Sequence, residues 1–336
     1  FMRLRILIYC LLAMVLAEAK AQDPIFSQFY NAPNQINPAF VGNTVGPVVA
    51  SNYRLQWPGF SSVYNTYMLS YDKFSPRFNS GFGTSILVDD AGDGALKTTK
   101  LSGLYSYRIF VRNETYIKFG LEMGLVQSRL DPSKLIFFDQ LDPQYGSVSP
   151  GGTTIPTQEN ISNIGTRFYP DVGAGVMIYS SKFYGGIGLK HLNNPDNGIL
   201  DNIENIDIGI PTRFTVHAGM QIDLEKGNNR LSSAFISPNI VFVKQGPFHQ
   251  INAGAHIDFG AFFTGLWYRD TANNGDAVIG SLGVRSGIYK ISYSYDLTVS
   301  GLGVNSGGSH ELGLILNFDS LLPKKSKYND CLNLFR

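Results

Sequence analysis

Two groups of residues are of types that could bind a metal ion. The stretch DDAGDG brings Asp89, Asp90 and Asp93 together, and the chain has five histidines. Clustered carboxylates suit Ca²⁺, but this stretch lacks the distant bidentate glutamate of a calcium loop. A glycine-rich hairpin turn explains it better. The histidines do not have metal-ligand spacing. The sequence therefore predicts no metal site and no cofactor.

Motifs for phosphate binding or nucleophilic catalysis are also incomplete. GGIG at 185–188 and GLGVNSGG at 301–308 superficially resemble phosphate-binding loops. Neither follows a strand and opens a helix with the required third glycine. The chain has no GxSxG motif, which marks a nucleophilic serine in many hydrolases. We therefore expect no catalytic residues and a protein that is not an enzyme.

Charged residues instead lie on one side of segments that alternate with a period of two. In HELGLILNF, 310–318, one parity is Leu312, Leu314, Leu316 and Phe318, and the other begins with Glu311. This alternation is typical of strands with one apolar face. On the polar parity, pairing across a barrel interior and a substrate pathway are both possible roles for Lys118, Glu122, Arg213, Asp223, Asp258, Arg285, Lys290, Asp296 and Glu311.

Strands of this kind follow one another along the chain and predict an all-β fold. We expect a transmembrane antiparallel β-barrel of about 14 strands, an even number as in bacterial outer-membrane barrels. A soluble sandwich is the alternative, but only 16% of residues are charged, against about 25% in soluble domains. The expected strands are 45–56, 62–72, 80–89, 97–112, 115–128, 167–180, 182–190, 212–224, 230–244, 248–259, 261–270, 277–286, 288–297 and 310–318.

The segments outside the strands predict how the chain is divided. Residues 1–21 resemble a cleaved signal peptide, with Arg3 and Arg5 before an apolar run. A plug-like segment at 22–44, the barrel at 45–318 and a periplasmic C-terminal tail at 319–336 follow. An even number of strands places both the N- and C-termini in the periplasm, and long outer loops at 129–166 and 191–211.

The segment QDPIFSQFYNAPNQINPAF, residues 22–40, fits neither a helix nor a strand. Prolines at 24, 33 and 38 prevent a regular hydrogen-bonded ladder. We expect it to fold into the periplasmic mouth or the lumen, burying Phe26, Phe29, Tyr30 and Phe40. A disordered leader is the alternative.

This opening also resembles the start of a known family. QDPIFSQFYNAPNQINPAFVG, YRLQWPGF and NTYMLSYD are similar to the PorP/SprF proteins of Bacteroidota, which serve type IX secretion and gliding motility. The resemblance continues through VDDAGDG and YSYRI. The matching residues are Gln22, Asp23, Pro24, Ser27, Gln28, Asn37, Pro38, Ala39, Gly42, Trp57 and Gly59.

The resemblance implies an integral outer-membrane protein without enzymatic activity. Its implied partners are a secreted or surface adhesin-type protein with a C-terminal sorting domain, other type IX secretion components and outer-membrane lipid. A net charge of +1 gives no reason to expect nucleic acid. We expect a surface adaptor whose outer loop binds the partner through Leu135, Ile136, Phe137, Phe138 and Tyr145. An outer-membrane channel or porin for small solutes is the alternative.

Overall fold

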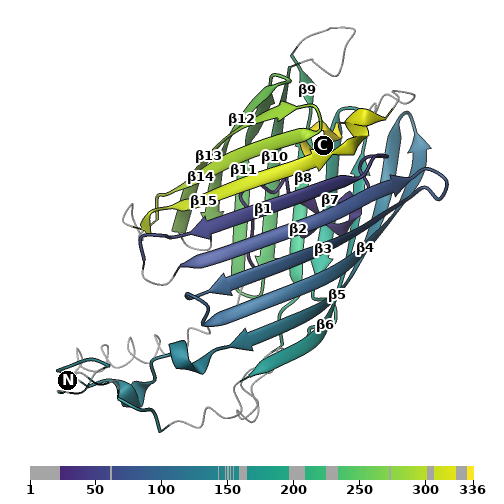
Figure 1. Cartoon of the computed structure of the whole chain (residues 1–336). Coiled ribbons are helices and arrows are strands. Elements are labelled where there is room, and N and C mark those ends of the chain that lie inside the picture. Colours follow the sequence, from purple (N-terminus) through teal and green to yellow (C-terminus); the bar gives the residue numbers. More distant parts are fainter. Residues whose placement is uncertain are drawn as a thin grey trace, which may run out of the picture.

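A closed antiparallel barrel is the main feature of the computed structural model of this chain (Figure 1). Its fifteen strand segments form one sheet, and β10 (Phe235–Gln245) pairs with β11 (Phe248–Asp258) to close it. β8 (Arg213–Met220) and β9 (Ile222–Asp223) pair in succession with β10, so they share one position in a 14-stranded wall. The predicted all-β antiparallel barrel and its strand number are therefore confirmed.

The structure describes residues 23–60, 63–142, 144–147, 149, 151, 153, 155–158, 165–196, 209–224, 234–271, 274–300, 306–322 and 331–336. The expected signal peptide and Gln22 lie outside these residues. Among the described residues, none of the helices has the length and apolar character needed to cross a membrane.

Each predicted strand overlaps an observed one. The remaining strands are β1 (Val48–Gln56), β2 (Tyr64–Ser75), β3 (Ser80–Ala91), β4 (Leu96–Arg112), β5 (Thr115–Leu130), β6 (Thr166–Tyr179), β7 (Phe183–Lys190), β12 (Phe262–Thr271), β13 (Asn274–Ser286), β14 (Tyr289–Thr298) and β15 (Ser309–Asn317). Short 3-10 helices are η1 (Pro33–Gln35), η2 (Pro38–Phe40), η3 (Pro132–Lys134), η4 (Phe138–Gln140), η6 (Phe318–Leu321) and η7 (Leu332–Phe335).

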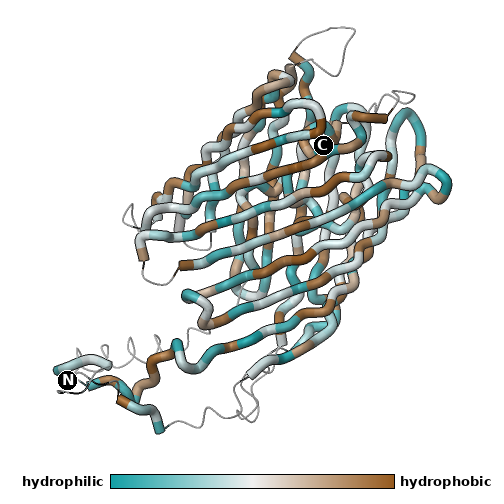
Figure 2. Tube along the Cα trace, in the orientation of Figure 1, coloured by the Kyte–Doolittle hydropathy of each residue, from teal (hydrophilic) through white to brown (hydrophobic). Residues whose placement is uncertain are grey.

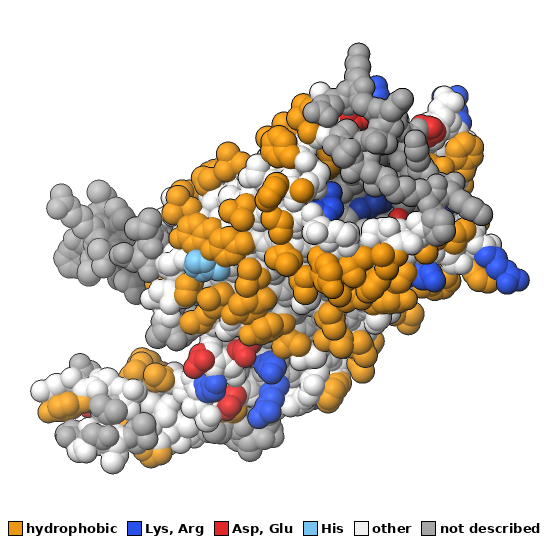
Figure 3. All heavy atoms as spheres, turned by 45° about the horizontal axis from the view of Figure 1, so that its top comes forward, with side chains coloured by type: hydrophobic (Ala, Val, Ile, Leu, Met, Phe, Trp, Pro, Cys, Tyr) orange, Lys and Arg blue, Asp and Glu red, His pale blue; other side chains and the backbone are white. Residues whose placement is uncertain are grey.

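The alternation of side chains gives the wall an apolar outside and a mostly polar inside. On β15, which lies between β14 and β1, Leu312 and Leu314 are 51% and 40% exposed, whereas Glu311 on the opposite face is fully buried. Polar and apolar residues alternate along the strands in Figure 2, and hydrophobic side chains form a broad patch across the middle of the barrel surface in Figure 3. Because a closed sheet pairs its backbone internally, this apolar outside is suited to contact with lipid.

The two rims of the barrel differ in their connections. Turns 76–79, 113–114, 180–182, 259–261 and 287–288 are short and lie at the rim where β1 begins and β15 ends. We call this the tail rim. The opposite rim carries the long connections 131–165 and 191–212, and we call it the loop rim.

Residues 23–47, here called the inner strap, run through the interior from one rim to the other. At the loop rim, Asp23 contacts His191, 2.7 Å from carboxylate oxygen to Nε2. At the tail rim, Phe318 N–H donates to the Pro47 carbonyl at 3.0 Å. The aromatic side chains that the sequence analysis singled out are all buried on the strap: Phe26, Phe29, Tyr30 and Phe40.

Inward-facing glycines on the wall make room for the strap. A Cβ on Gly120 of β5 would lie 2.1 Å from the Ala39 nitrogen, and one on Gly175 of β6 would lie 2.0 Å from Asn37 Oδ1. Any larger side chain at these two positions would therefore collide with η2 or its N-cap.

The ends of the described chain do not lie at one rim. The C-terminal residues are at the tail rim, where the Cys331 N–H donates to Ser180 in the turn between β6 and β7. Asp23 is at the loop rim. The prediction that both ends lie on the same side is therefore wrong for Asp23, because the strap crosses the lumen before β1 begins. An even number of strands fixes only the positions where the chain enters and leaves the wall.

Candidate functional site: the strap contacts and the loop rim

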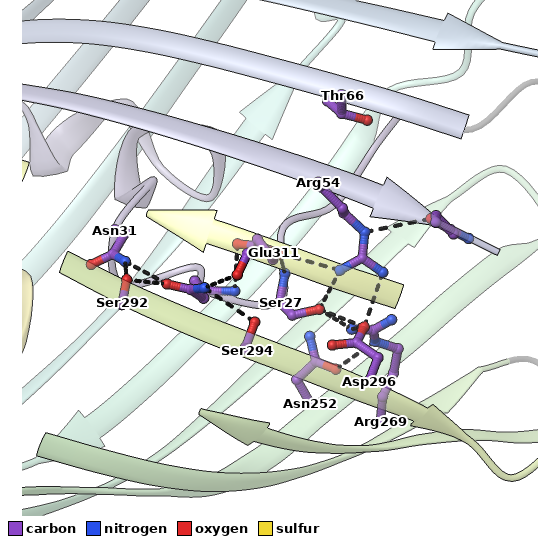
Figure 4. A network of polar contacts seen from close by, with 12 residues as sticks. Ser27, Asn31, Arg54, Thr66, Asn252, Arg269, Ser292, Ser294, Asp296 and Glu311 are labelled. Carbon is purple, nitrogen blue, oxygen red and sulfur yellow. Dashed lines mark hydrogen bonds and ion pairs between the residues drawn. The ribbon is translucent and has the colours of Figure 1, made fainter. Parts of the chain in front are cut away.

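Ser27 lies at the centre of a buried charged network (Figure 4). Its hydroxyl donates to Asp296 Oδ2 at 2.6 Å, and its backbone N–H donates to Glu311 Oε2 at 2.8 Å. Arg54 from β1 bridges both acids, at 3.0 Å to Asp296 and 3.2 Å to Glu311. Arg269 from β12 also pairs with Asp296, at 2.7 Å. Two cations thus balance two carboxylates around one strap residue.

Gln28 continues these contacts along β14 and β15. Its N–H donates to Glu311 Oε1 at 3.0 Å, and its side-chain amide donates to the Glu311 carbonyl at 2.9 Å. Asn31, one turn further, donates from its side chain to Ser292 Oγ at 2.7 Å. Ser27, Gln28 and Asn31 therefore all bind inward-facing positions of β14 and β15.

A second charged network holds the first residue of the strap. Asp23 accepts a hydrogen bond from His191 and also forms an ion pair with Arg213 at 3.4 Å. His191 Nδ1 lies 2.9 Å from Asp171 on β6, so the imidazole lies between two carboxylates. Further ion pairs in this network join Lys100 to Asp171, Lys100 to Glu122, and Lys190 to Glu122.

The ionisation of the Asp23–His191 pair follows from this geometry. Burial alone would lower the pKa of His191, but the charges of Asp23 and Asp171 and their hydrogen bonds raise it to about 9. Burial would raise the pKa of Asp23, but His191 and Arg213 hold it well below its usual range. Near neutral pH the pair is therefore a charged hydrogen bond, a stronger type than a neutral one.

The half of the strap nearer the tail rim is held by hydrogen bonds to the wall. The Asn37 amide donates to the carbonyls of Val176 and Ile187, at 3.0 and 3.1 Å. Lys118 on β5 donates to the Val41 carbonyl at 2.7 Å. Gly42 N–H donates to Asp72 on β2 at 2.8 Å. These contacts fix the strap to β2, β5, β6 and β7.

The C-terminal residues pack beneath the strap at the tail rim. The rings of Phe335 and Phe40 are 4.6 Å apart between centroids. Lys290 on β14 donates to the Leu334 carbonyl at 3.1 Å, and Arg336 donates to the Asn43 carbonyl at 3.2 Å. Cys331 is fully buried here. The strap and the C-terminal residues therefore fill this part of the lumen together.

The structure brings most residues of the family motif into the strap contacts. Asp23, Ser27, Gln28, Asn37 and Gly42 all bind the wall as described above. Pro38 and Ala39 form η2 and are buried, and Pro24 lies partly exposed next to Asp23.

Trp57 and Gly59 do not contact the strap in this way; they lie in the turn after β1 at the loop rim. Their N–H groups donate to the carbonyls of Gly308 and Ser306, at 2.8 and 3.0 Å. This turn therefore packs on the connection between β14 and β15.

The expected partner-binding residues lie on the long connection at the loop rim. Ile136, Phe138 and Tyr145 are 63%, 90% and 46% exposed, whereas Leu135 and Phe137 are partly buried. Leu141, which the sequence analysis did not select, is also exposed at 52%. Part of the second expected loop, residues 197–208, lies outside the described residues.

The candidate metal ligands do not come together. In the described part of the chain, no group of three or more histidine, cysteine or acidic side chains is arranged to hold a metal ion. The DDAGDG stretch ends β3 and enters the turn that follows, where Gly92, Asp93 and Gly94 have left-handed φ angles of 68°, 55° and 82°.

Several wall residues that hold the strap were not predicted from the sequence. Arg54, Lys100, Asp171, Lys190 and Arg269 all lie on inward positions of segments predicted to be strands. The period-two alternation was the signal that could have found them. Asp223, expected inside, is instead exposed at the tail rim.

Solved structures similar to this chain include a transporter, an outer-membrane protein and a porin. The Ralstonia pickettii toluene transporter TbuX has a TM-score of 0.46 and 8% identity, over 85% of this chain and 92% of that one. Acinetobacter baumannii Omp33 has a TM-score of 0.41 and 7% identity, over 82% and 100%. A Rh. blastica porin variant has a TM-score of 0.34 and 8% identity, over 81% and 99%.

One protein-family model matches the chain, over residues 18–316, and it is described as "Type IX secretion system membrane protein PorP/SprF". No curated protein matches.

Proposed function

Because the chain belongs to the PorP/SprF family of type IX secretion system membrane proteins, we propose that it is an adaptor in the outer membrane. Its loop rim faces the cell exterior and holds a large secreted or surface-attached protein, of the adhesin type with a C-terminal sorting domain. Its tail rim faces the periplasm and the rest of the secretion machine. The adaptor acts by binding and carries out no reaction.

Exposed apolar side chains on a long connection carry this proposal. Ile136, Phe138 and Leu141 lie on or beside the short helices η3 and η4, away from the barrel wall (Figure 1). Large apolar side chains that are exposed together mark binding sites, and aromatic residues are the usual anchors. Internal bonds shape this connection: the Gln140 amide donates to the Ile155 carbonyl at 2.8 Å.

The occupied lumen supports an adaptor over an open pore. The strap and the C-terminal residues act as the plug that we propose for residues 22–44. Tyr30, Phe40, Val41 and Leu334 are all fully or almost fully buried between the walls. Without the strap the barrel would enclose an aqueous channel, because side chains alone fill the interior only of barrels with about eight strands.

The proposal is tested by changing the exposed anchors without changing the barrel. We expect Ile136→Ser with Phe138→Ser to reduce recovery of the surface partner in crosslinked pull-downs by roughly tenfold or more, as for interface anchors. Gln144→Ala on the same connection is the matched control, because its side chain is exposed and polar. If removal of residues 133–160 from an inserted barrel left the display of every surface partner unchanged, the adaptor function would be wrong.

Conduction of small solutes is the second candidate function. The inward-facing side chains of the wall are mostly polar, so water could fill the lumen if the strap moved out of it. Planar bilayer recordings of the whole chain and of a variant without residues 23–44 separate the two functions. An adaptor gives no conductance with the strap in place, whereas a channel conducts as the whole chain. If neither protein conducted, the channel function would be excluded.

A further inference from the structure

A notch interrupts the outer wall at the tail rim, where the chain passes from the strap into β1. The first pairs of β1 join Val48 to Asp72 on β2 and to Asn317 on β15. β2 continues beyond this point to Ser75, whereas the chain before Val48 turns into the lumen. The Phe74 N–H of β2 donates to the Thr44 carbonyl at 2.9 Å. The wall therefore lacks one strand over the last residues of β2.

The notch forms an apolar groove of about 770 Å³ on the outer surface. Its walls include Tyr71, Phe78, Phe82 and Leu322, which are 44%, 59%, 47% and 41% exposed. Its floor is formed by residues 45–47 of the strap. This volume lies within the roughly 300–1,000 Å³ of typical small-molecule sites.

Positive charge lies in and beside this groove. Lys73 lines it, and the Arg77 guanidinium lies 5.6 Å from the centre of the Phe78 ring. The described residues that line the groove include no acid. The two acids next to the groove, Asp72 and Asp319, each accept a backbone N–H of the strap, from Gly42 and Gly46.

We propose that this groove binds one anionic phospholipid. The acyl chains lie along Tyr71, Phe82 and Leu322, and the phosphate group is bound by Lys73 and Arg77. The groove opens onto the apolar, lipid-facing side of the barrel, so acyl chains can enter from the membrane without crossing water. Basic residues at the edge of an apolar membrane surface attract anionic headgroups.

A lipid fits this groove better than an added protein strand. A strand binds mainly through free backbone groups at a sheet edge. Here the Phe74 N–H already has a partner in Thr44, and the Gly46 N–H donates to Asp319 at 2.7 Å. The groove therefore offers side-chain surface and two cations, with these two amides already bonded.

Native mass spectrometry of the whole, detergent-purified barrel tests the proposal. Phosphatidylglycerol and the zwitterionic phosphatidylcholine are the two probes. We expect the wild type to retain one phosphatidylglycerol in preference to phosphatidylcholine. Lys73→Gln with Arg77→Gln should reduce retained phosphatidylglycerol by roughly tenfold, as expected when two cations near a membrane surface are removed. Lys244→Gln, which removes an exposed cation on β10 at the loop rim, should retain it as the wild type does.

A groove-filling variant separates the headgroup from the acyl chains. Thr84→Trp places a bulky ring on the outward face of β3 within the groove and should displace both lipids. The heat-dependent gel mobility of each variant reports folding, and photo-crosslinks from a diazirine-bearing phosphatidylglycerol should map to Phe78, Phe82 or Leu322. Equal retention of the two lipids by the wild type, or undiminished phosphatidylglycerol on the double variant, would overturn the proposal.

Discussion

Individual buried charges decide where the strap lies. Ser27 is bound by two acids that are themselves paired with Arg54 and Arg269, so each of these acids has an oppositely charged partner. Buried pairs of this kind contribute little compared with apolar packing, but removing one partner is costly. The network therefore specifies the position of the strap more than it adds to total stability.

Arg54→Ala is the residue change that tests this balance. It leaves Glu311 without its guanidinium partner and Asp296 with Arg269 alone. We expect a loss of about 3 kcal/mol in the free energy of unfolding, the size found when one member of a buried pair is removed. Denaturant titration followed by gel mobility measures it. Lys244→Ala, on an exposed position, should change the same quantity by less than about 0.5 kcal/mol.

The first residue of the strap should respond to pH through His191. Its folded pKa, about 9, is above the unfolded value of about 6.5. The stabilisation is therefore fully present below about pH 6.5 and is lost as pH rises through about 9. We expect protease cleavage near residues 23–30 to increase as the pH is raised from about 7 to about 10.

His191→Gln provides the control, because it keeps a polar side chain but does not titrate. We expect cleavage near residues 23–30 in this variant to vary little over the same range. An equal increase of cleavage with pH in both proteins would show that the Asp23–His191 pair is not responsible.

At the scale of elements, the strands could be predicted and the strap path could not. Each strand repeats its pattern every two residues, as on β15, so a few positions identify the whole element. The strap has no repeat, and the contact that fixes its start joins Asp23 and His191, 168 positions apart. Its composition predicted burial of Phe26 and Tyr30. Nothing local specified that it crosses the barrel from rim to rim.

The fit between the strap and its wall can be changed at one glycine. Gly120→Leu would place side-chain atoms where η2 lies, since even a Cβ would approach Ala39 N to 2.1 Å. We expect the barrel to remain folded while the strap is displaced, with new protease sites in residues 23–44. Gly280→Leu, on the outward face of β13 where a Cβ would meet nothing within 4 Å, should leave the strap protected.

At the scale of the whole molecule, the two rims make the barrel directional. The loop rim carries the long connections 131–165 and 191–212, whereas the tail rim combines short turns, the C-terminal residues and the notch between η6 and β2. The strap touches both rims and is fixed at each. An adaptor that binds a surface protein on one side and a secretion machine on the other needs this asymmetry, and the family membership gives it a biological setting.

The direction of the barrel in the membrane can be measured with two variants that each carry one new cysteine. Ser133 is exposed on the long connection at the loop rim, and Asn79 is exposed in a turn at the tail rim. Ser133→Cys and Asn79→Cys therefore place a reactive thiol at one rim each. The native Cys331 is buried and should react slowly in either folded variant.

A membrane-impermeant maleimide added to intact cells then reports which rim faces outward. With the loop rim outside, the Ser133→Cys variant is labelled strongly, whereas the Asn79→Cys variant is labelled only after the outer membrane is permeabilised. The wild type gives the background from Cys331. Labelling of the Asn79→Cys variant alone in intact cells would reverse the orientation, and the loop rim could then no longer bind a surface partner.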